Sequence, residues 1–276
     1  MENQEKKMSL VGHMKELRFR IFAVLIFFVI TFIIGFFLTQ PVIDFFRSSP
    51  AMENIEWNVF NVSDAIMIYM KFAFMIALVF TLPFILYQIW RFVAPGLTKK
   101  ERSSTVWFIP IAFLLFVIGV SFAYFVVFPM IIQFLLGITE LLDANEMFGM
   151  NQYFSFMFNL IIPFGLLFEL PIIVVFLTRI GILSPKLLIR FRKIAYLILV
   201  IVGASITPPD LVSELLVIIP LIFLYEISIW LSKITLAFRE KRMKDSYQDS
   251  EYIDIKKVSG TEEIQEDKND DNNISE

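Results

Sequence analysis

The stretch IFAVLIFFVITFIIGFFLT, residues 21–39, contains 19 residues and no charged side chain. At about 1.5 Å of rise per residue, a helix of this length covers nearly the roughly 30 Å hydrocarbon core of a bilayer. The stretch therefore predicts a transmembrane helix. The charged residues before it are not followed by a short apolar core and a small-residue cleavage site, so we expect an uncleaved span rather than a signal peptide.

Further apolar stretches follow along the chain. The chain is 57% hydrophobic with a mean hydropathy of +0.71, whereas soluble domains contain about 45–50% apolar residues. We therefore predict an all-α membrane protein with six transmembrane helices, contained in a membrane domain over residues 21–232. The five predicted spans after the first are residues 66–90, 105–136, 153–178, 194–206 and 212–231.

The basic residues are distributed unequally between the two sides of the predicted bundle. The loops opposite the N-terminus contain only Arg47, and Lys71 lies near the outer end of the second span. By the positive-inside rule, both termini are predicted to be cytoplasmic, and we expect a multi-pass protein of the cell membrane. On the side of the N-terminus, 19 of the 24 lysines and arginines fall in residues 6–20, 91–102, 179–193 and 233–244.

The two ends of the chain differ from the membrane domain. Residues 1–20 are predicted to form a cytoplasmic amphipathic N-terminus. Residues 245–276 contain eleven acidic residues and three lysines, a net charge of −8, while residues 1–244 carry +5. Such a polar segment cannot bury enough apolar area to offset the entropy of ordering. We therefore expect residues 233–276 to be a cytoplasmic tail, first basic and then acidic, that is disordered from about residue 245.

The prolines and the length of the fifth stretch predict the shape of the bundle. Each proline removes one backbone hydrogen bond and favours a kink, so we expect kinked helices in a curved body. The fifth stretch has 13 residues and covers only about 20 Å, and Glu214 and Glu226 shorten the sixth. We therefore predict that the fifth and sixth helices are short. The prolines within the spans are Pro83, Pro110, Pro129, Pro163, Pro171 and Pro220.

Glu169 is the acidic residue that lies deepest in a predicted span, within FGLLFELP at residues 164–171. An ionised carboxylate at this depth costs several kcal/mol, so Glu169 must be paired, hydrated or protonated. This position predicts an intramembrane polar site that faces water or a partner. The alternative is a neutral carboxyl bonded to a carbonyl freed by Pro163 or Pro171. Lys71 and Glu226 lie near span ends and are interpreted as structural, with Lys71 snorkelling towards the interface.

Several function classes are disfavoured by what the sequence contains. It has no cysteine and one histidine, His13, so neither a disulfide framework nor a cysteine or histidine metal cluster is expected. No nucleotide-binding glycine-rich run and no Gly-x-Ser-x-Gly motif occurs. We therefore expect no enzyme activity, no catalytic or metal site, no cofactor and no nucleic-acid partner. A secondary transporter or ion channel remains the alternative, with Glu169, Lys71 and Glu214 as ion sites, although no inverted repeat is visible.

Two cytoplasmic segments combine acidic with basic residues. HMKELRFR, residues 13–20, leads into the first span, and FVAPGLTKKER, residues 92–102, follows the second. Taken singly, each acid has a structural explanation, because Glu16 can pair with Arg20 at i, i+4 and Glu101 can cap the next helix.

These two segments and three later motifs resemble the TatC family, the multispanning receptor subunits of the twin-arginine protein translocase. The resemblance implies that Glu16 and Glu101 face the twin-arginine motif of a signal peptide, with Arg18 and Phe92 shaping the same site. A guanidinium offers a carboxylate planar bidentate donors that lysine cannot reproduce. The resemblance covers about residues 13–232, and its motifs are residues 13–20, 92–102, 119–129, 164–171 and 207–210.

The resemblance also implies partners and an energy source. The apolar part of the signal peptide would lie along a concave face that includes Glu169. Single-span subunits of the TatA and TatB types would dock near the fifth and sixth spans, around Thr207 and Glu214, although the family pattern has glutamine where this chain has Glu214. Folded precursors would be exported with the proton-motive force by a self-associating complex in the lipid bilayer. Asp210 follows two prolines, which is typical of a turn or helix cap.

Overall fold

The computed structural model describes residues 10–48, 57–96, 102, 105–142 and 147–272, and most of these residues are helical. Two short strands and a single 3-10 turn, η1 (Ala94–Gly96), complete the described elements. The strands are β1 (Trp57–Asn58) and β2 (Phe148–Gly149). The helices are α1 (Leu10–Arg47), α2 (Asp64–Val93), α4 (Phe108–Phe122), the π-helical turn η2 (Ala123–Val127), α5 (Phe128–Leu141), α6 (Met150–Leu167), α7 (Leu170–Arg179), α8 (Pro185–Arg190), α9 (Arg192–Ile206) and α10 (Leu211–Asn272).

The helices confirm a mostly helical, multi-pass membrane protein. Helix α9 has 15 residues and covers only about 22 Å, less than the roughly 30 Å of a hydrocarbon core. The sixth crossing therefore stays a prediction. Within the described residues, five helices or broken helices are long and apolar enough to span a bilayer: Met14–Arg47, Asp64–Val93, Phe108–Leu141, Met150–Arg179 and Leu211–Lys241.

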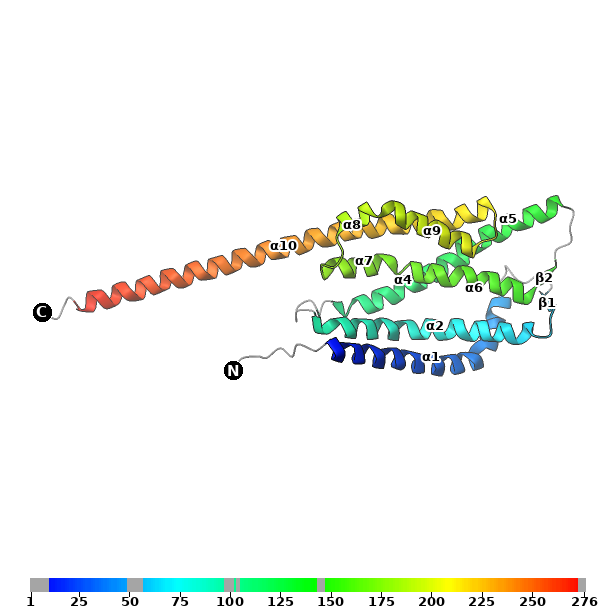
Figure 1. The fold of residues 1–276 in the computed structure, drawn as a ribbon, viewed down its shortest axis with the longest axis horizontal. Helices are drawn as coiled ribbons and strands as arrows, with labels where there is room; N and C mark the ends of the chain where they lie inside the picture. Colours follow the sequence, from blue (N-terminus) through cyan, green and yellow to red (C-terminus); the bar gives the residue numbers. More distant parts are fainter. Residues whose placement is uncertain (1–9, 49–56, 97–101, 103–104, 143–146, 273–276) are drawn as a thin grey trace.

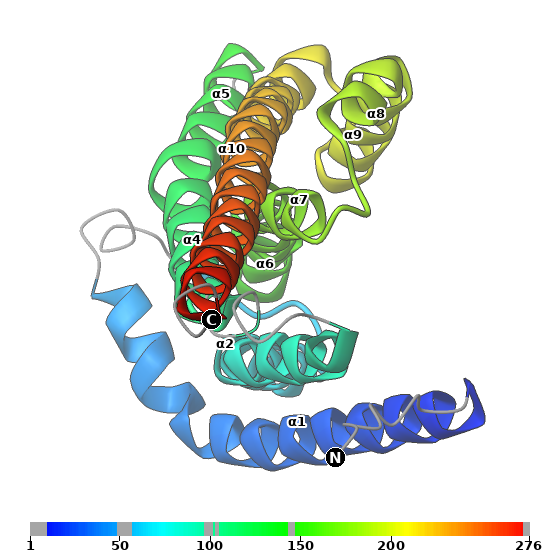
Figure 2. The same ribbon diagram turned by 90° about the vertical axis from the view of Figure 1, so that its left-hand side faces the viewer.

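The helices form an elongated bundle with distinct ends (Figure 1). The start of α1 and the far end of α10 lie at the same end of the bundle, and the strands lie at the opposite end. There β1 and β2 pair in parallel, with Trp57 opposite Phe148, which joins two loops that are distant in sequence. Seen along the bundle, α1 lies against α2, α10 lies beside α7, and the α8–α9 pair flanks α10 (Figure 2).

Aromatic side chains fill the centre of the bundle. Phe72 of α2 packs edge-on against Phe154 and Phe158 of α6, with 4.9 Å between ring centroids in both pairs. Such aromatic pairs favour edge-to-face geometry. Helices in a bilayer gain little from burying apolar area against each other, so close packing of this kind holds them together.

Two glycines let α4 and α6 approach closely. A Cβ atom added to Gly119 would lie 2.7 Å from the Cβ of Phe168, and one added to Gly165 would lie 2.7 Å from the ring of Phe116. Both distances are too short for carbon atoms, so the crossing requires small residues, as is common between membrane helices.

Two spans are interrupted where proline follows. The π-helical turn η2 immediately precedes Phe128 and Pro129, and α6 ends before Glu169, two residues ahead of Pro171. Proline lacks the N–H that would bond the carbonyl four residues earlier. By contrast, α2, α6 and α10 continue through Pro83, Pro163 and Pro220. Helix α1 contains Pro41 and bends in its last third (Figure 2).

The C-terminal segment is helical in the structure, and its disorder from about residue 245 stays a prediction. Helix α10 continues to Asn272 and projects well beyond the bundle (Figure 1), through the acidic residues that follow residue 245. A helix satisfies its backbone hydrogen bonds internally, so a polar sequence can prolong an anchored helix. Composition alone does not reveal this continuation.

Candidate functional site

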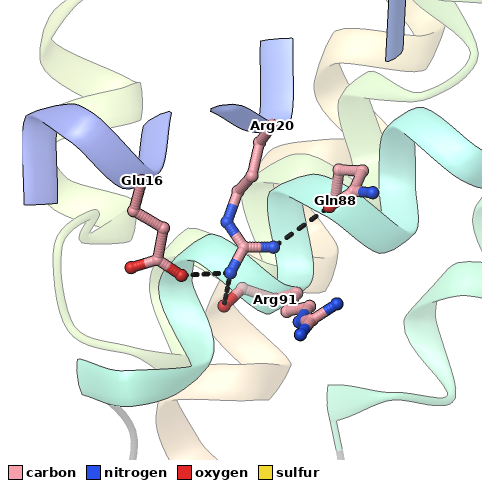
Figure 3. Close-up of polar contacts among 4 residues, drawn as sticks. All are labelled: Glu16, Arg20, Gln88 and Arg91. Carbon is pink, nitrogen blue, oxygen red and sulfur yellow. Dashed lines mark hydrogen bonds and ion pairs between the residues drawn. The ribbon is translucent and has the colours of Figure 1, made fainter. Parts of the chain in front are cut away.

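Arg20 joins α1 to the C-terminal end of α2 (Figure 3). Its guanidinium forms an ion pair with Glu16, one turn earlier on α1. Nη1 donates to the side-chain oxygen of Gln88 at 3.0 Å, and Nη2 lies 3.4 Å from the carbonyl oxygen of Arg91. Arg20 is only 8% exposed. A single buried guanidinium thus fixes the carboxylate of Glu16 against the end of α2.

Only one of the two carboxylate oxygens of Glu16 is hydrogen-bonded in this cluster. Oε1 accepts from Arg20, whereas Oε2 is buried and has no hydrogen-bond partner among the described residues. A buried carboxylate oxygen without a donor is costly. The i, i+4 pair that the sequence predicts therefore occurs, and it still leaves Glu16 with an acceptor oxygen.

The other residues predicted to bind the signal peptide are Arg18, Phe92 and Glu101. Arg18 is exposed on α1, and Phe92 is half-buried near the end of α2. Glu101 lies outside the described residues, so its predicted place beside Glu16 stays a prediction. Arg102 places its guanidinium 5.9 Å from the ring centroid of Trp90 in α2, which is cation–π distance.

Glu169 lies at the break between α6 and α7. It is 3% exposed, and both carboxylate oxygens are buried without a hydrogen-bond partner in the part of the chain that the structure describes. The contacts there do not include the bond to a proline-freed carbonyl that we considered as an alternative. A buried carboxyl without a partner is costly at membrane depth, so a donor from outside the described chain would lower its free energy.

Lys71 belongs to a polar network that the sequence did not reveal. Its ammonium donates to Asn151 at 2.6 Å and to the hydroxyl of Ser155. Asn151 in turn donates to the carboxylate of Asp64 at 2.9 Å. Lys71 is therefore held between α2 and α6 by side chains, which agrees with its structural interpretation, and it is a poor candidate for an open ion site.

A second ion pair joins the short helix α9 to α10. The guanidinium of Arg192 contacts both oxygens of Glu226, each at 2.9 Å, and the hydroxyl of Tyr196 donates to the same carboxylate. The two side chains are 39% and 37% exposed, so solvent weakens their attraction. Glu226 has the structural role that its position predicts, but its two partners were not foreseen.

The turn between α9 and α10 contains the predicted docking residues. Thr207 is buried and donates to the carbonyl of Gly203 at 3.1 Å. One carboxylate oxygen of Asp210 accepts from the backbone N–H of Ser213 at 2.7 Å, so this side chain caps α10. Glu214 is half-buried in the first turn of α10.

Known proteins of one family resemble this chain over most of its length. Residues 12–220 match the family described as Sec-independent protein translocase protein (TatC). The TatC protein of Halalkalibacterium halodurans is 46% identical over 248 residues, which cover 90% of this chain and 97% of that protein. The TatCy protein of Bacillus subtilis is 46% identical over 243 residues, covering 88% and 94%.

The fold leads to the same family. A crystal structure of the twin-arginine translocase receptor TatC superposes with a TM-score of 0.73 at 34% sequence identity, covering 81% of this chain and 99% of that one. Sequence and fold thus agree over the whole bundle that carries Glu16, Glu169 and the α9–α10 turn. The chain belongs to the TatC family of Sec-independent protein translocase proteins.

Proposed function

We propose that this chain is the core receptor of a twin-arginine translocase. It binds twin-arginine signal peptides at the cytoplasmic face, recruits single-span subunits of the TatA and TatB types, and exports folded precursors with the proton-motive force. The observation that carries the proposal is the carboxylate of Glu16, which Arg20 holds in place while its second oxygen stays buried without a partner. An acidic group of this kind suits the recognition of arginine, because a guanidinium binds carboxylate oxygens strongly.

The chemistry of recognition follows from the difference between arginine and lysine. A guanidinium has donors in a rigid planar fork, so it can reach a carboxylate oxygen and a neighbouring acceptor together, whereas an ammonium is a point charge. Glu16 would bind one arginine of the motif and Glu101 the other, with Arg18 and Phe92 bounding the site. Arg20 acts by positioning, because it fixes the rotamer of Glu16 before the peptide arrives.

Binding should fall when the two acids are removed. We expect the Glu16→Ala, Glu101→Ala double variant to reduce photo-crosslinking of a twin-arginine signal peptide in membranes by about tenfold or more, since a hydrogen bond to a charged group contributes about 1.5–3 kcal/mol. Glu140→Ala is the matched control, because Glu140 is an exposed acid near the end of α5. Equal loss in both variants would remove the specific role of Glu16 and Glu101.

The intramembrane groups fit a second step, in which a partner helix enters the bundle. Glu169 has two buried oxygens and no described donor, so a polar group on an inserted helix would satisfy it. The α9–α10 turn offers a second docking edge, where Thr207 and Asp210 shape the outer end and Glu214 is half-buried. The short α9 would thin the bilayer locally at this edge, because short spans draw the lipid surfaces together.

This scheme requires six crossings with both termini in the cytoplasm. The chain contains no cysteine, so one introduced cysteine is labelled without background. We expect a membrane-impermeant maleimide to label Ser48→Cys and Leu211→Cys in intact cells, and to label Ser184→Cys only after the membrane is opened. Leu211 is 78% exposed. Labelling of Ser184→Cys and Leu211→Cys from the same side would show that α9 does not cross.

A further inference from the structure

An apolar groove lies on the bundle where α2, α4 and α7 meet, at the end where α2 and α7 finish. Its volume is about 310 Å³. Ile173 of α7 is 44% exposed and lines the groove, so the groove opens on the outer surface of the bundle. Its lining includes Leu86, Trp90, Phe108, Ala112, Ile173 and Phe176.

Two arginines from different elements lie over aromatic rings that line this groove. The guanidinium of Arg102 lies 5.9 Å from the ring centroid of Trp90, and that of Arg179 lies 5.5 Å from the ring centroid of Phe108. Neither arginine is in an ion pair with a described residue. Stacking on a ring orients a guanidinium but does not neutralise it, so both arginines can bind an anion.

We propose that this groove binds one anionic phospholipid of the cytoplasmic leaflet, with an acyl chain among the apolar side chains and the phosphate at Arg102 and Arg179. Arginine is well suited to phosphate because its donors match the phosphate oxygens. The depth of the groove in the bilayer agrees with a lipid occupant, since the ends of α2 and α7 lie where the headgroups of that leaflet are expected. The leaflet assignment rests on the proposed orientation of the chain, whereas the choice of an anionic lipid rests on the groove itself.

The other candidate occupant is the apolar segment of a signal peptide. Its arginines precede that segment, so a peptide in this groove would bring positive charge towards Arg102 and Arg179. Like charges at short range repel, whereas a phosphate at the same place is attracted. The charges at the groove therefore favour the lipid.

The proposal predicts a charge-selective lipid site in the full-length protein. Native mass spectrometry should show one phosphatidylglycerol retained more tightly than phosphatidylcholine with the same acyl chains. The Arg102→Gln, Arg179→Gln double variant should weaken phosphatidylglycerol binding at this site by roughly 30-fold, given the attraction of anionic lipids to each basic residue. The Arg190→Gln variant is the control, because Arg190 is exposed on α8.

A second variant tests the apolar half of the site. Ile173→Trp fills the groove and leaves both arginines in place, so it should also weaken phosphatidylglycerol binding. The proposal is overturned if the wild type retains both lipids equally, if Arg190→Gln weakens binding as much as the double variant, or if Ile173→Trp leaves phosphatidylglycerol binding unchanged. A twin-arginine peptide that displaces phosphatidylglycerol, and binds less well to Ile173→Trp, would assign the groove to the peptide instead. Lipid binding is measured without export or signal peptide, so failure here is distinct from failure of the receptor proposal.

Discussion

The Arg20→Ala variant should lose most of its twin-arginine signal-peptide binding although Arg20 itself need not touch the peptide. The guanidinium connects Glu16 with the side chain of Gln88 and the carbonyl of Arg91, and the side chains of Arg20 and Glu16 are 10% and 22% exposed. Removing one member of a buried ion pair costs about 3–5 kcal/mol. Because Glu16 is partly exposed, we expect the free energy of unfolding to fall by an amount near the lower end of that range. The carboxylate of Glu16 would then no longer be fixed against α2, which weakens peptide binding.

The test measures peptide crosslinking and thermal unfolding of the purified protein together. Arg20→Lys should recover little of the crosslinking, since one ammonium cannot reproduce the forked contacts of the guanidinium. Lys15→Ala, at an exposed position of the same helix, should resemble the wild type in both measurements. Wild-type crosslinking in a folded Arg20→Ala protein would show that Glu16 needs no positioning, and would contradict the described site.

The second large effect is a pair of opposite results at two glycines. Gly119→Ala should destabilise the protein by about 1–3 kcal/mol, because overpacking forces neighbouring groups apart and the new methyl would lie 2.7 Å from the Cβ of Phe168. Gly137→Ala meets no atom within 4 Å and should stabilise the protein by about 0.5–1 kcal/mol, because the unfolded chain has less conformational freedom with alanine than with glycine and so loses less entropy on folding.

The unfolding midpoints of the two variants in the same detergent measure this difference. Phe168 directly precedes Glu169, so Gly119→Ala also displaces the break between α6 and α7. Equal midpoints for Gly119→Ala and Gly137→Ala would mean that α4 and α6 do not pack at the described distance.

The sequence predicts those features that depend on neighbouring residues. Long apolar runs predict the spans because a bilayer admits only segments whose backbone is internally bonded. The pair between Glu16 and Arg20 follows from helical spacing. The kink that the sequence predicts at Pro171 is likewise local, because the missing N–H acts on the preceding turn.

Features that depend on distant residues could not be predicted in this way. Asn151 meets Asp64 across 87 positions, and Arg192 meets Glu226 across 34, so only the packing of the helices reveals these partners. The same holds for the groove, whose walls come from three helices. The prolines alone also do not show which spans are interrupted, since α2 and α10 continue through Pro83 and Pro220 where neighbouring helices can compensate.

The most direct test of the receptor proposal compares two signal peptides that differ only in their paired basic residues. A photo-reactive group beside the pair reports contact with the wild-type chain in membranes, and a folded reporter fused to each peptide reports export. We expect the twin-arginine peptide to crosslink near Glu16 and to be exported, and the twin-lysine peptide to do neither. Equal crosslinking of both peptides to the wild-type chain would contradict the claim that this carboxylate reads arginine.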